Sequence, residues 1–224
     1  MADPIQTLWQ IAIVAVPIIV AITLHEAAHG YAARHFGDDT AALAGRISLN
    51  PLRHIDPFGT ILLPGLLLLS HAGFVFGYAK PVPVNFAALR HPKRDMIWVA
   101  AAGPGMNILL AVMSALLLYL LLRAGAANRI AFEFLWGSVE INLVLAVFNL
   151  LPIPPLDGGR VAVGILPQPF SSALAQLGRF GMLLLLAVFI VLPLLGVDLF
   201  HYVVQIPVAF LERPLLALLA TRTQ

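Results

Sequence analysis

The chain has 224 residues, of which 60% are hydrophobic and only 11% are charged, a balance typical of a polytopic helical membrane protein rather than of a water-soluble domain. With a net charge of +2 and few basic residues, nucleic acid is not an expected partner. The absence of cysteine excludes disulfides, iron–sulfur clusters and thiolate zinc sites, so any bound metal must be held by histidine, carboxylate or backbone oxygen.

The first predicted element is a helix over residues 5–36, an apolar run of roughly 48 Å that is long enough to cross a bilayer. Pro17 is expected to kink it. No basic segment precedes the run, and it continues directly into polar residues at positions 25 to 29. We therefore expect this helix to stay in the protein rather than to be removed as a signal peptide.

Residues 25–29 read His-Glu-Ala-Ala-His. His25 and His29 are four residues apart and so lie on one helix face, where both imidazoles can reach one ion. Glu26 lies beside that face, where its carboxylate can take a proton from water at the metal. The alternative, two packing histidines beside an unrelated acid, would leave three polar groups in lipid without a metal or a partner, which is strongly unfavourable. The pattern predicts a metal site with Glu26 as general base.

Between the first two long helices we expect short pieces that do not span the membrane. Residues 40–50 indicate an extended or hairpin segment, and the apolar residues 60–70 a re-entrant or interfacial piece. Residues 74–84 are strand-like, but their two prolines restrict them to a sheet edge or an open loop. His54 is interpreted as an interfacial loop residue, with a contribution to the site as the alternative.

A polar hinge over 91–95 is expected to precede a second helix over 96–122, and a third covers 130–150. Residues 151–159 read Leu-Pro-Ile-Pro-Pro-Leu-Asp-Gly-Gly and must break the helical pattern, because three prolines fall within four residues.

After this break, a helix is expected to resume over 160–166, and residues 171–195 form another candidate span. Residues 198–220, interrupted by Pro207 and Pro214, either span the membrane or lie at its surface. The predicted fold class is an all-α polytopic membrane protein with about five to six membrane helices and a small β-hairpin or re-entrant region on the cytoplasmic side.

Positive charge predicts the orientation. The loop after the second helix carries only Arg123 and Arg129. Segments 34–60 and 73–95 carry seven basic residues, namely Arg34, Arg46, Arg53, Lys80, Arg90, Lys93 and Arg94. By the positive-inside rule these two segments are cytoplasmic and the N-terminus is outside. The end of the first helix and the Pro-rich break then lie at the same cytoplasmic depth.

Asp157, inside the break, is the expected third ligand. A catalytic zinc site keeps three protein ligands and one open position, and irregular backbone at membrane depth is tolerated where it lines a polar cavity. Gly158 and Gly159 are expected to permit backbone angles that turn the carboxylate towards the first helix. The alternative is an Asp that closes a Pro-Gly turn at the membrane surface, and the histidines at matching depth favour the ligand interpretation.

Three blocks resemble the site-2 protease family, the intramembrane zinc metalloproteases of peptidase family M50. They are residues 25–29, residues 102–107 (Ala-Gly-Pro-Gly-Met-Asn) and residues 149–159, in the family's order. Residues 45–51 and 79–84 look like its small bacterial and archaeal members without a PDZ domain. The resemblance implies one zinc ion per chain held by His25, His29 and Asp157, with Glu26 as catalytic base.

The resemblance also implies hydrolysis of a peptide bond in or near a transmembrane segment of a membrane-protein substrate. Asn149 then donates a hydrogen bond to the substrate or the developing oxyanion, or else it caps the end of the third helix. Asn107, with Gly103, is expected to serve close helix packing more than direct chemistry. A substrate strand could add to the extended segments at 41–49 and 74–84.

We expect a single integral membrane protease domain over residues 1–224, with a core over 5–166 that holds both motifs and additional helices over 167–224. No long polar insert is present that could form a separate peptide-binding domain. The expected location is a prokaryotic plasma membrane, with the site towards the cytoplasm and the lipid bilayer and a transmembrane substrate as partners. The alternatives are a proteolytically inactive metal-binding membrane protein, in which Glu26 need not be intact, and a metal-ion transporter, in which Glu26 has no task.

Overall fold

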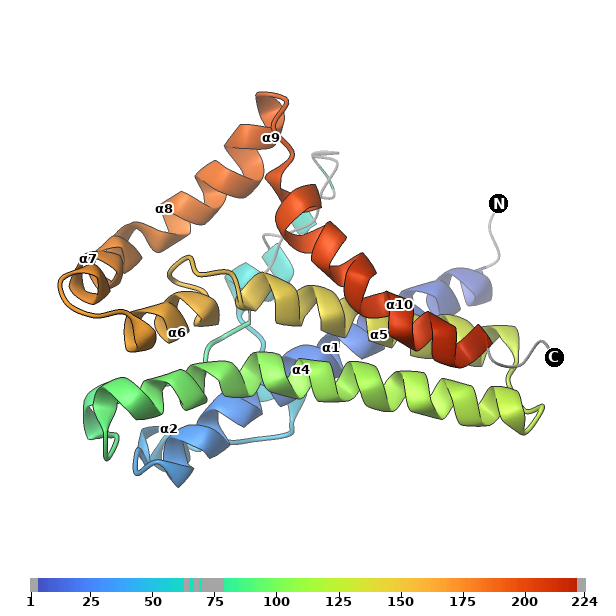
Figure 1. The fold of residues 1–224 in the computed structure, drawn as a ribbon. Helices are drawn as coiled ribbons and strands as arrows, with labels where there is room; N and C mark the ends of the chain where they lie inside the picture. Colours follow the sequence, from blue (N-terminus) through green and yellow to red (C-terminus); the bar gives the residue numbers. More distant parts are fainter. Residues whose placement is uncertain (1–3, 63–64, 67–68, 70–78, 221–224) are drawn as a thin grey trace.

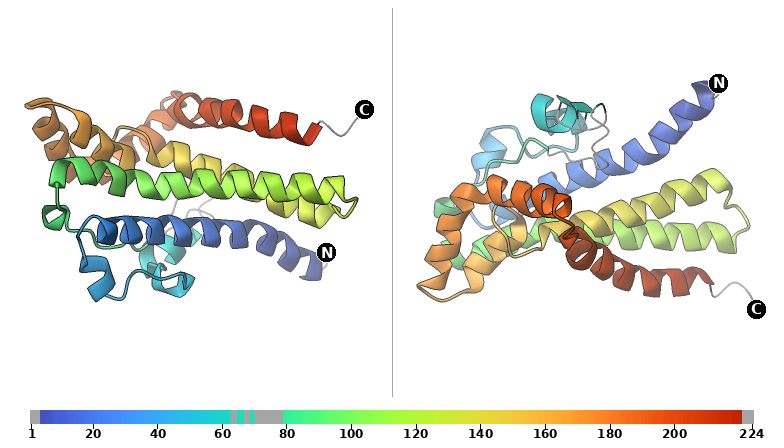
Figure 2. Two further views of the ribbon diagram at one scale, coloured as in Figure 1. Left: turned by 60° about the horizontal axis from the view of Figure 1, so that its bottom comes forward. Right: turned by 90° about the horizontal axis from the view of Figure 1, so that it is seen from above.

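Four long helices form the body of the protein in this computed structural model, which describes residues 4–62, 65–66, 69 and 79–220. They are α1 (Pro4–His35), α4 (Pro92–Arg123), α5 (Arg129–Asn149) and α10 (Ile206–Ala220). The start of α1 and the end of α10 lie at the same end of the body in every view (Figures 1 and 2). The other end carries the shorter elements, and the Pro-rich break enters it from α5.

The described residues contain five helical stretches that are long and apolar enough to cross a membrane, and no β-strand. They are Ala12–His35, Pro92–Arg123, Arg129–Asn149, Phe170–Phe189 and His201–Ala220. The predicted all-α membrane fold is confirmed, and the weaker candidate over 198–220 is long and apolar enough to be a span. The hairpin is not seen in the described part of the chain; residues 74–78 of the segment 74–84 lie outside it, and residues 79–84 form no strand.

Small side chains allow α4 and α5 to approach closely. Ala111 and Ala115 of α4 are fully buried against Val139 and Leu143 of α5. Val204 and Val208 add the packing of the C-terminal helix to the same cluster. In lipid, where burying apolar surface gains little, such close backbone approach and van der Waals contact hold helices together.

The first connection differs from the extended segment expected over 40–50. It begins with the short helix α2 (Thr40–Leu43), whose Ala41 is fully buried. The Asp38 carboxylate accepts a hydrogen bond from the Thr40 N–H at 2.9 Å, so it satisfies a backbone donor at the helix start. The 3₁₀-helix Pro51–Arg53, the π-helix Pro57–Leu62 and the 3₁₀-helix Phe86–Ala88 follow.

Helix α4 begins earlier than expected, because the residues predicted to form a hinge are its first turn. Pro92 occupies the start of the helix, where its missing N–H costs nothing. The Asp95 carboxylate accepts a hydrogen bond from the His91 N–H at 2.8 Å and so helps to define the helix start. The polar residues therefore belong to the helix that carries part of the site.

The break after α5 is confirmed. Helix α6 (Asp157–Ile165) follows it, so the resumed helix begins at Asp157 itself rather than at Arg160. The predicted span over 171–195 is a succession of helical pieces that runs obliquely away from α4 and α5 (Figure 1). These are α7 (Phe170–Leu177), Gly178–Phe180, α8 (Gly181–Leu186), Ala187–Val191 and α9 (Leu192–Leu194), and the π-helix His201–Gln205 then leads into α10.

Candidate metal centre

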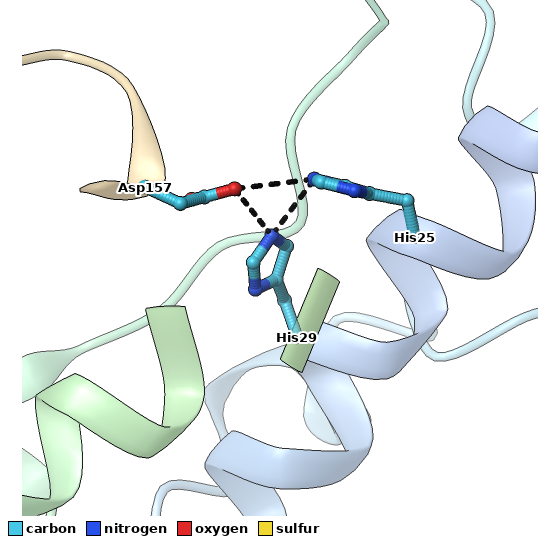
Figure 3. A group of neighbouring side chains, drawn as sticks. All are labelled: His25, His29 and Asp157. Carbon is cyan, nitrogen blue, oxygen red and sulfur yellow. Dashed lines mark hydrogen bonds and ion pairs between the residues drawn. The ribbon is translucent and has the colours of Figure 1, made fainter. Parts of the chain in front are cut away.

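Three buried side chains converge at the end of α1 that faces the break. His25 and His29 come from α1 and Asp157 from the first residue of α6, and all three point to one place (Figure 3). The Oδ2 atom of Asp157 lies 3.2 Å from Nε2 of His25 and 3.2 Å from Nε2 of His29. The two Nε2 atoms are 3.0 Å apart. The structure thus brings together the three ligands predicted from the sequence.

The geometry of this triangle fits a zinc ion. Bonds of about 2.0–2.2 Å in tetrahedral coordination place neighbouring ligand atoms about 3.3–3.6 Å apart, a little more than the three separations found here. Two imidazoles and one carboxylate are also a donor set that zinc takes in catalytic sites, with the fourth position left for water or substrate. The residues present therefore fit the metal that the sequence motif predicts.

Both histidines are held in the tautomer that leaves Nε2 free for a metal. Nδ1 of His29 is 2.7 Å from the Val99 carbonyl oxygen, which can only accept, so Nδ1 carries the proton. Nδ1 of His25 is 2.6 Å from Oδ1 of Asn107. A ligating histidine that donates its other N–H to a fixed acceptor keeps its ring orientation and gains basicity.

Asn107 is itself fixed by a buried polar chain across α1, α4 and α5. Its Nδ2 donates to the Ala21 carbonyl at 3.3 Å and to Oδ1 of Asn142 at 2.9 Å, which leaves Oδ1 to face His25. Asn142 in turn donates to the Ser138 carbonyl at 2.8 Å. Asn107 and Asn142 are 0% and 1% exposed. Asn107 thus joins three helices, as expected of a packing residue, and its side chain also contacts His25 directly.

Gly103 of α4 lies directly against the two histidines. A Cβ atom at this position would lie 2.6 Å from Nε2 of His25 and closer still to Nε2 of His29. Both distances are far below van der Waals contact, so any side chain here would displace the ligand atoms. The expected role of Gly103 in close packing is confirmed, and the groups it packs against are the imidazoles of His25 and His29.

We expect Gly103→Ala to weaken zinc binding by about tenfold or more, since loss of an outer partner of a zinc ligand costs about 10–100-fold and this change moves the ligands themselves. Zinc content of the purified variant, measured against a competing chelator, tests this. Gly105→Ala is the matched control, because a Cβ at Gly105 meets open space. Equal zinc affinity in both variants would contradict the packing role.

The environment of Asp157 keeps its carboxylate ionised. Burial alone would raise the pKa of Asp157, but when the imidazoles of His25 and His29 carry a proton on Nε2 in place of a metal, their hydrogen bonds and charge outweigh burial and hold that pKa well below its usual range. Nη1 of Arg160 lies 3.4 Å from Oδ1, and the helix dipole at the start of α6 adds to the same effect. A carboxylate in this state is ready to bind a cation.

Gly158 and Gly159 do not have the unusual backbone angles that the sequence suggested, since both lie in α6 and neither has a positive φ. Their role is close approach. A Cβ at Gly158 would collide with the Leu150 carbonyl, and one at Gly159 would lie 2.5 Å from the backbone nitrogen of Pro154. The two glycines let α6 fold back against the end of α5, which brings Asp157 to the histidines.

Glu26 is held by the backbone of the segment after the undescribed residues. Its Oε2 accepts a hydrogen bond from the Val82 N–H at 2.7 Å. Pro81 and Pro83 on either side carry no N–H, so Val82 supplies the donor at this point of the segment. Among the described residues Val82 is the hydrogen-bond partner of Glu26, and the other carboxylate oxygen can take a second partner.

The segment that holds Glu26 is tied down at both ends. At one end the Lys80 N–H donates to the His54 carbonyl at 2.9 Å, and at the other the Asn85 N–H donates to Asp38 at 2.7 Å. Burial alone would raise the pKa of Asp38, but hydrogen bonds from Thr40 and Asn85 outweigh it and lower that pKa. Asp38 therefore stays ionised and fixes the end of the segment whose Val82 N–H binds Glu26.

A cavity of about 210 Å³ opens beside His25, His29 and Asp157, which we call the triad. His25 and Glu26 line it on one side, and Asn149 lines it from the end of α5. The Nδ2 group of Asn149 donates to the Leu145 carbonyl at 3.0 Å. Most of the remaining wall is apolar and comes from Ile22, Leu145, Phe148, Leu156, Met182 and Leu185.

His54 has a different position from the other candidates. It is 2% exposed, its Nε2–H donates to the Ser48 carbonyl at 2.8 Å, and its described contacts do not include the triad. It therefore supports the loop that holds Glu26.

Asn142 and the Val82 N–H were missed by the sequence reasoning. An Asn inside an apolar helix is a signal that could have found Asn142. No sequence signal marks the backbone of Val82.

The chain matches the profile of peptidase family M50 over residues 122–192. It is 40% identical over 180 residues to YwhC of Bacillus subtilis (strain 168), an alignment that covers 78% of each protein. The chain belongs to peptidase family M50, the site-2 proteases. It is also 33% identical over 186 residues to Rip2 of Mycobacterium tuberculosis (strain ATCC 25618 / H37Rv), covering 80% of this chain and 66% of Rip2. Both relatives are named "putative zinc metalloprotease".

A third relative, MJ0392 of Methanocaldococcus jannaschii, is 22% identical over 162 residues, which cover 71% of this chain and 36% of that protein, and is named a zinc metalloprotease. No solved structure matches the chain. The family and the five apolar helical stretches found among the described residues identify this protein as an integral membrane protein.

Proposed function

We propose that this M50 protein is an intramembrane zinc metalloprotease that hydrolyses a peptide bond in or near a transmembrane segment of a membrane-protein substrate. The observation that carries the proposal is the buried triangle of His25, His29 and Asp157, with ligand atoms 3.0–3.2 Å apart, next to a cavity that Glu26 also lines. The names of the relatives support zinc as the metal. One zinc ion per chain would bind to the three side chains.

When bound, zinc supplies Lewis acidity to the scissile carbonyl and to the attacking water. Glu26 accepts a proton from that water as it attacks, and later passes the proton to the nitrogen of the leaving amine. The Val82 N–H holds one carboxylate oxygen of Glu26 at 2.7 Å, and the other oxygen would contact the water. During these steps Asn107 and the Val99 carbonyl keep the two imidazole rings in their orientation.

The lining of the cavity fits an apolar peptide substrate, which must be locally unfolded to enter it. A peptide bond within a helix is shielded, so the substrate has to be extended beside the triad before it reacts. The mostly apolar wall of the 210 Å³ cavity fits side chains from a membrane segment, and it keeps bulk water away from the reacting atoms. Asn149, at the rim, is placed to donate to the substrate backbone once its bond to the Leu145 carbonyl is exchanged.

The proposed setting is a prokaryotic plasma membrane, with the site towards the cytoplasm and residues 1–224 as one membrane domain. The support is the excess of basic residues in the segments that flank the site end of α1 and the start of α4, which favours the cytoplasmic side. An inactive metal-binding protein or a metal-ion transporter would give no task to Glu26, which lines the same cavity as His25.

Co-expression with a set of single-span membrane proteins, each tagged at both ends, tests the proposal. We expect a shortened product whose new terminus, mapped by mass spectrometry, falls in or beside the membrane segment. In purified vesicles the reaction should stop with a zinc chelator and return when zinc is added. Cuts confined to soluble domains, or cleavage that is indifferent to the chelator, would overturn the proposed activity.

A further inference from the structure

A second and larger cavity, of about 490 Å³, lies between the N-terminal half of α1 and α5. In the view from above, these two helices diverge from each other towards their outer ends (Figure 2, right). The cavity is lined by Val14 and Ile18 of α1 and by Gly137, Glu140 and Val144 of α5, among others. Its wall is mostly apolar, and Val14 is 61% exposed.

The residues that line this cavity are followed along α1 and α5 by residues that line the cavity at the metal centre. On α1, Val14 and Ile18 line the outer cavity, and Ile22 and Glu26 line the inner one. These four residues are spaced by four and so form one inclined stripe that turns by about 40° around the helix at each step. The stripe from Val14 to Glu26 is about 18 Å long, more than half of the hydrocarbon thickness of a bilayer.

The facing side of α5 shows the same continuity. Gly137, Glu140 and Val144 line the outer cavity, and Phe148 lines the inner one, again at helical spacing of three or four. Val144 of the outer cavity directly precedes Leu145 of the inner one. We name the surface formed by these two stripes the α1–α5 groove. The groove runs along the helix axes, from the end where α1 and α5 diverge to the triad.

We propose that the α1–α5 groove is the docking site for the apolar transmembrane helix of the substrate, which lies between α1 and α5 while its end near the triad unwinds into the inner cavity. This inference rests on the proposed function, because it takes a membrane-spanning substrate as the occupant. The groove's direct continuity with the metal centre favours that occupant, since a helix seated there delivers its next residues to His25 and Glu26.

Glu140 gives the groove a chemical preference. Its carboxylate is exposed on the groove wall, and its Oε1 accepts a hydrogen bond from the Trp136 indole N–H at 2.8 Å. A carboxylate on an apolar wall favours a partner with a donor side chain at that level. Glu140 lies nine residues before Asn149, about 13 Å along α5, so the donor is expected at that distance from the bond to be cut.

The test uses a defined probe, a lysine-flanked helix of about 20 leucine and alanine residues with one cysteine, mixed with the protein in phosphatidylcholine vesicles. The protein carries Glu26→Gln, so the outcome does not depend on cleavage. Because the chain has no cysteine, Ile141→Cys in the groove and Ile108→Cys on the exposed face of α4 report contact by disulfide formation. We expect about tenfold more disulfide at position 141 than at 108.

Filling the groove is the second arm. A Cβ at Gly137 meets open space, so Gly137→Leu occupies the groove without a clash in the protein itself. We expect it to lower disulfide formation at position 141 by about tenfold, while the matched Gly105→Leu on α4 leaves it within about twofold. A probe with one lysine at the level of Glu140 should crosslink more than the all-apolar probe, and Glu140→Gln should remove that difference.

The outcomes separate this inference from the proposed function. Equal disulfide at positions 141 and 108, or no effect of Gly137→Leu, would mean that lipid fills the groove and would overturn the docking site, while zinc-dependent cleavage by the unmodified protein would be untouched. Conversely, strong crosslinking that Gly137→Leu abolishes would support the docking site even in a protein that cuts nothing.

Discussion

Replacing Glu26 with glutamine is expected to abolish peptide-bond hydrolysis and to leave zinc content and fold unchanged. Glutamine keeps the size of the side chain and can still meet the Val82 N–H through its amide oxygen, so the loop contact at 2.7 Å can persist. It cannot take a proton from the attacking water. Loss of a general base typically costs about 10²–10⁴-fold in rate, which here removes turnover from any practical assay.

The measurement is the rate of product formation from a cleaved single-span substrate, together with zinc per chain by elemental analysis. Glu212→Gln is the matched control, because it makes the same chemical change on α10, and Glu212 does not line the cavity at the triad. Near-normal turnover by the Glu26→Gln protein would remove Glu26 from the mechanism. A zinc-free variant would instead show that Glu26 helps to build the site.

The meeting of His25, His29 and Asp157 was predictable because the three residues obey local rules. His25 and His29 share a helix face by the spacing of the α-helix alone, and three prolines within four residues fix a break wherever they occur. Charge counting then placed the end of α1 and the break at one depth, which is what brought Asp157 into the prediction. The three ligand atoms are found together in the structure.

The residues that support the ligands were not predictable in the same way. The contact of Asn107 with His25 joins residues 82 positions apart, and it depends on how α4 is rotated against α1. Helix rotation is set by packing of the kind seen at Gly103, where the missing Cβ admits two imidazoles. A sequence shows that a glycine and an asparagine are present, but not which way the helix face turns.

The secondary structure predicted from the sequence was also wrong at two helix starts. Residues 40–43 were expected to be extended, yet the Asp38 carboxylate accepts the Thr40 N–H and starts a helix in an alanine-rich stretch that favours it. Residues 92–95 were expected to be a hinge, yet proline is well tolerated in a first helical turn. In both cases the residues form the start of a helix. A helix start has a composition similar to that of a loop, so composition alone did not distinguish the two.

Removal of one ligand is expected to empty the metal site. We expect His29→Ala to lower zinc affinity by at least about 10²-fold, since loss of an outer partner of a ligand alone costs about 10–100-fold. Two remaining ligands cannot hold zinc in the geometry of a catalytic site. The Asp157 carboxylate would also lose one of its two histidine partners at 3.2 Å.

Zinc per chain and cleavage should therefore fall together in His29→Ala, which distinguishes it from Glu26→Gln, where only cleavage falls. His201→Ala is the matched control, because His201 is exposed on the C-terminal π-helix and pairs with Gln205 at 2.8 Å. Circular dichroism should show unchanged helix content in both variants, since a small truncation at the triad leaves the packing of α4 against α5 intact. Full zinc retention in a folded His29→Ala protein would show that the triangle of His25, His29 and Asp157 is not the metal site.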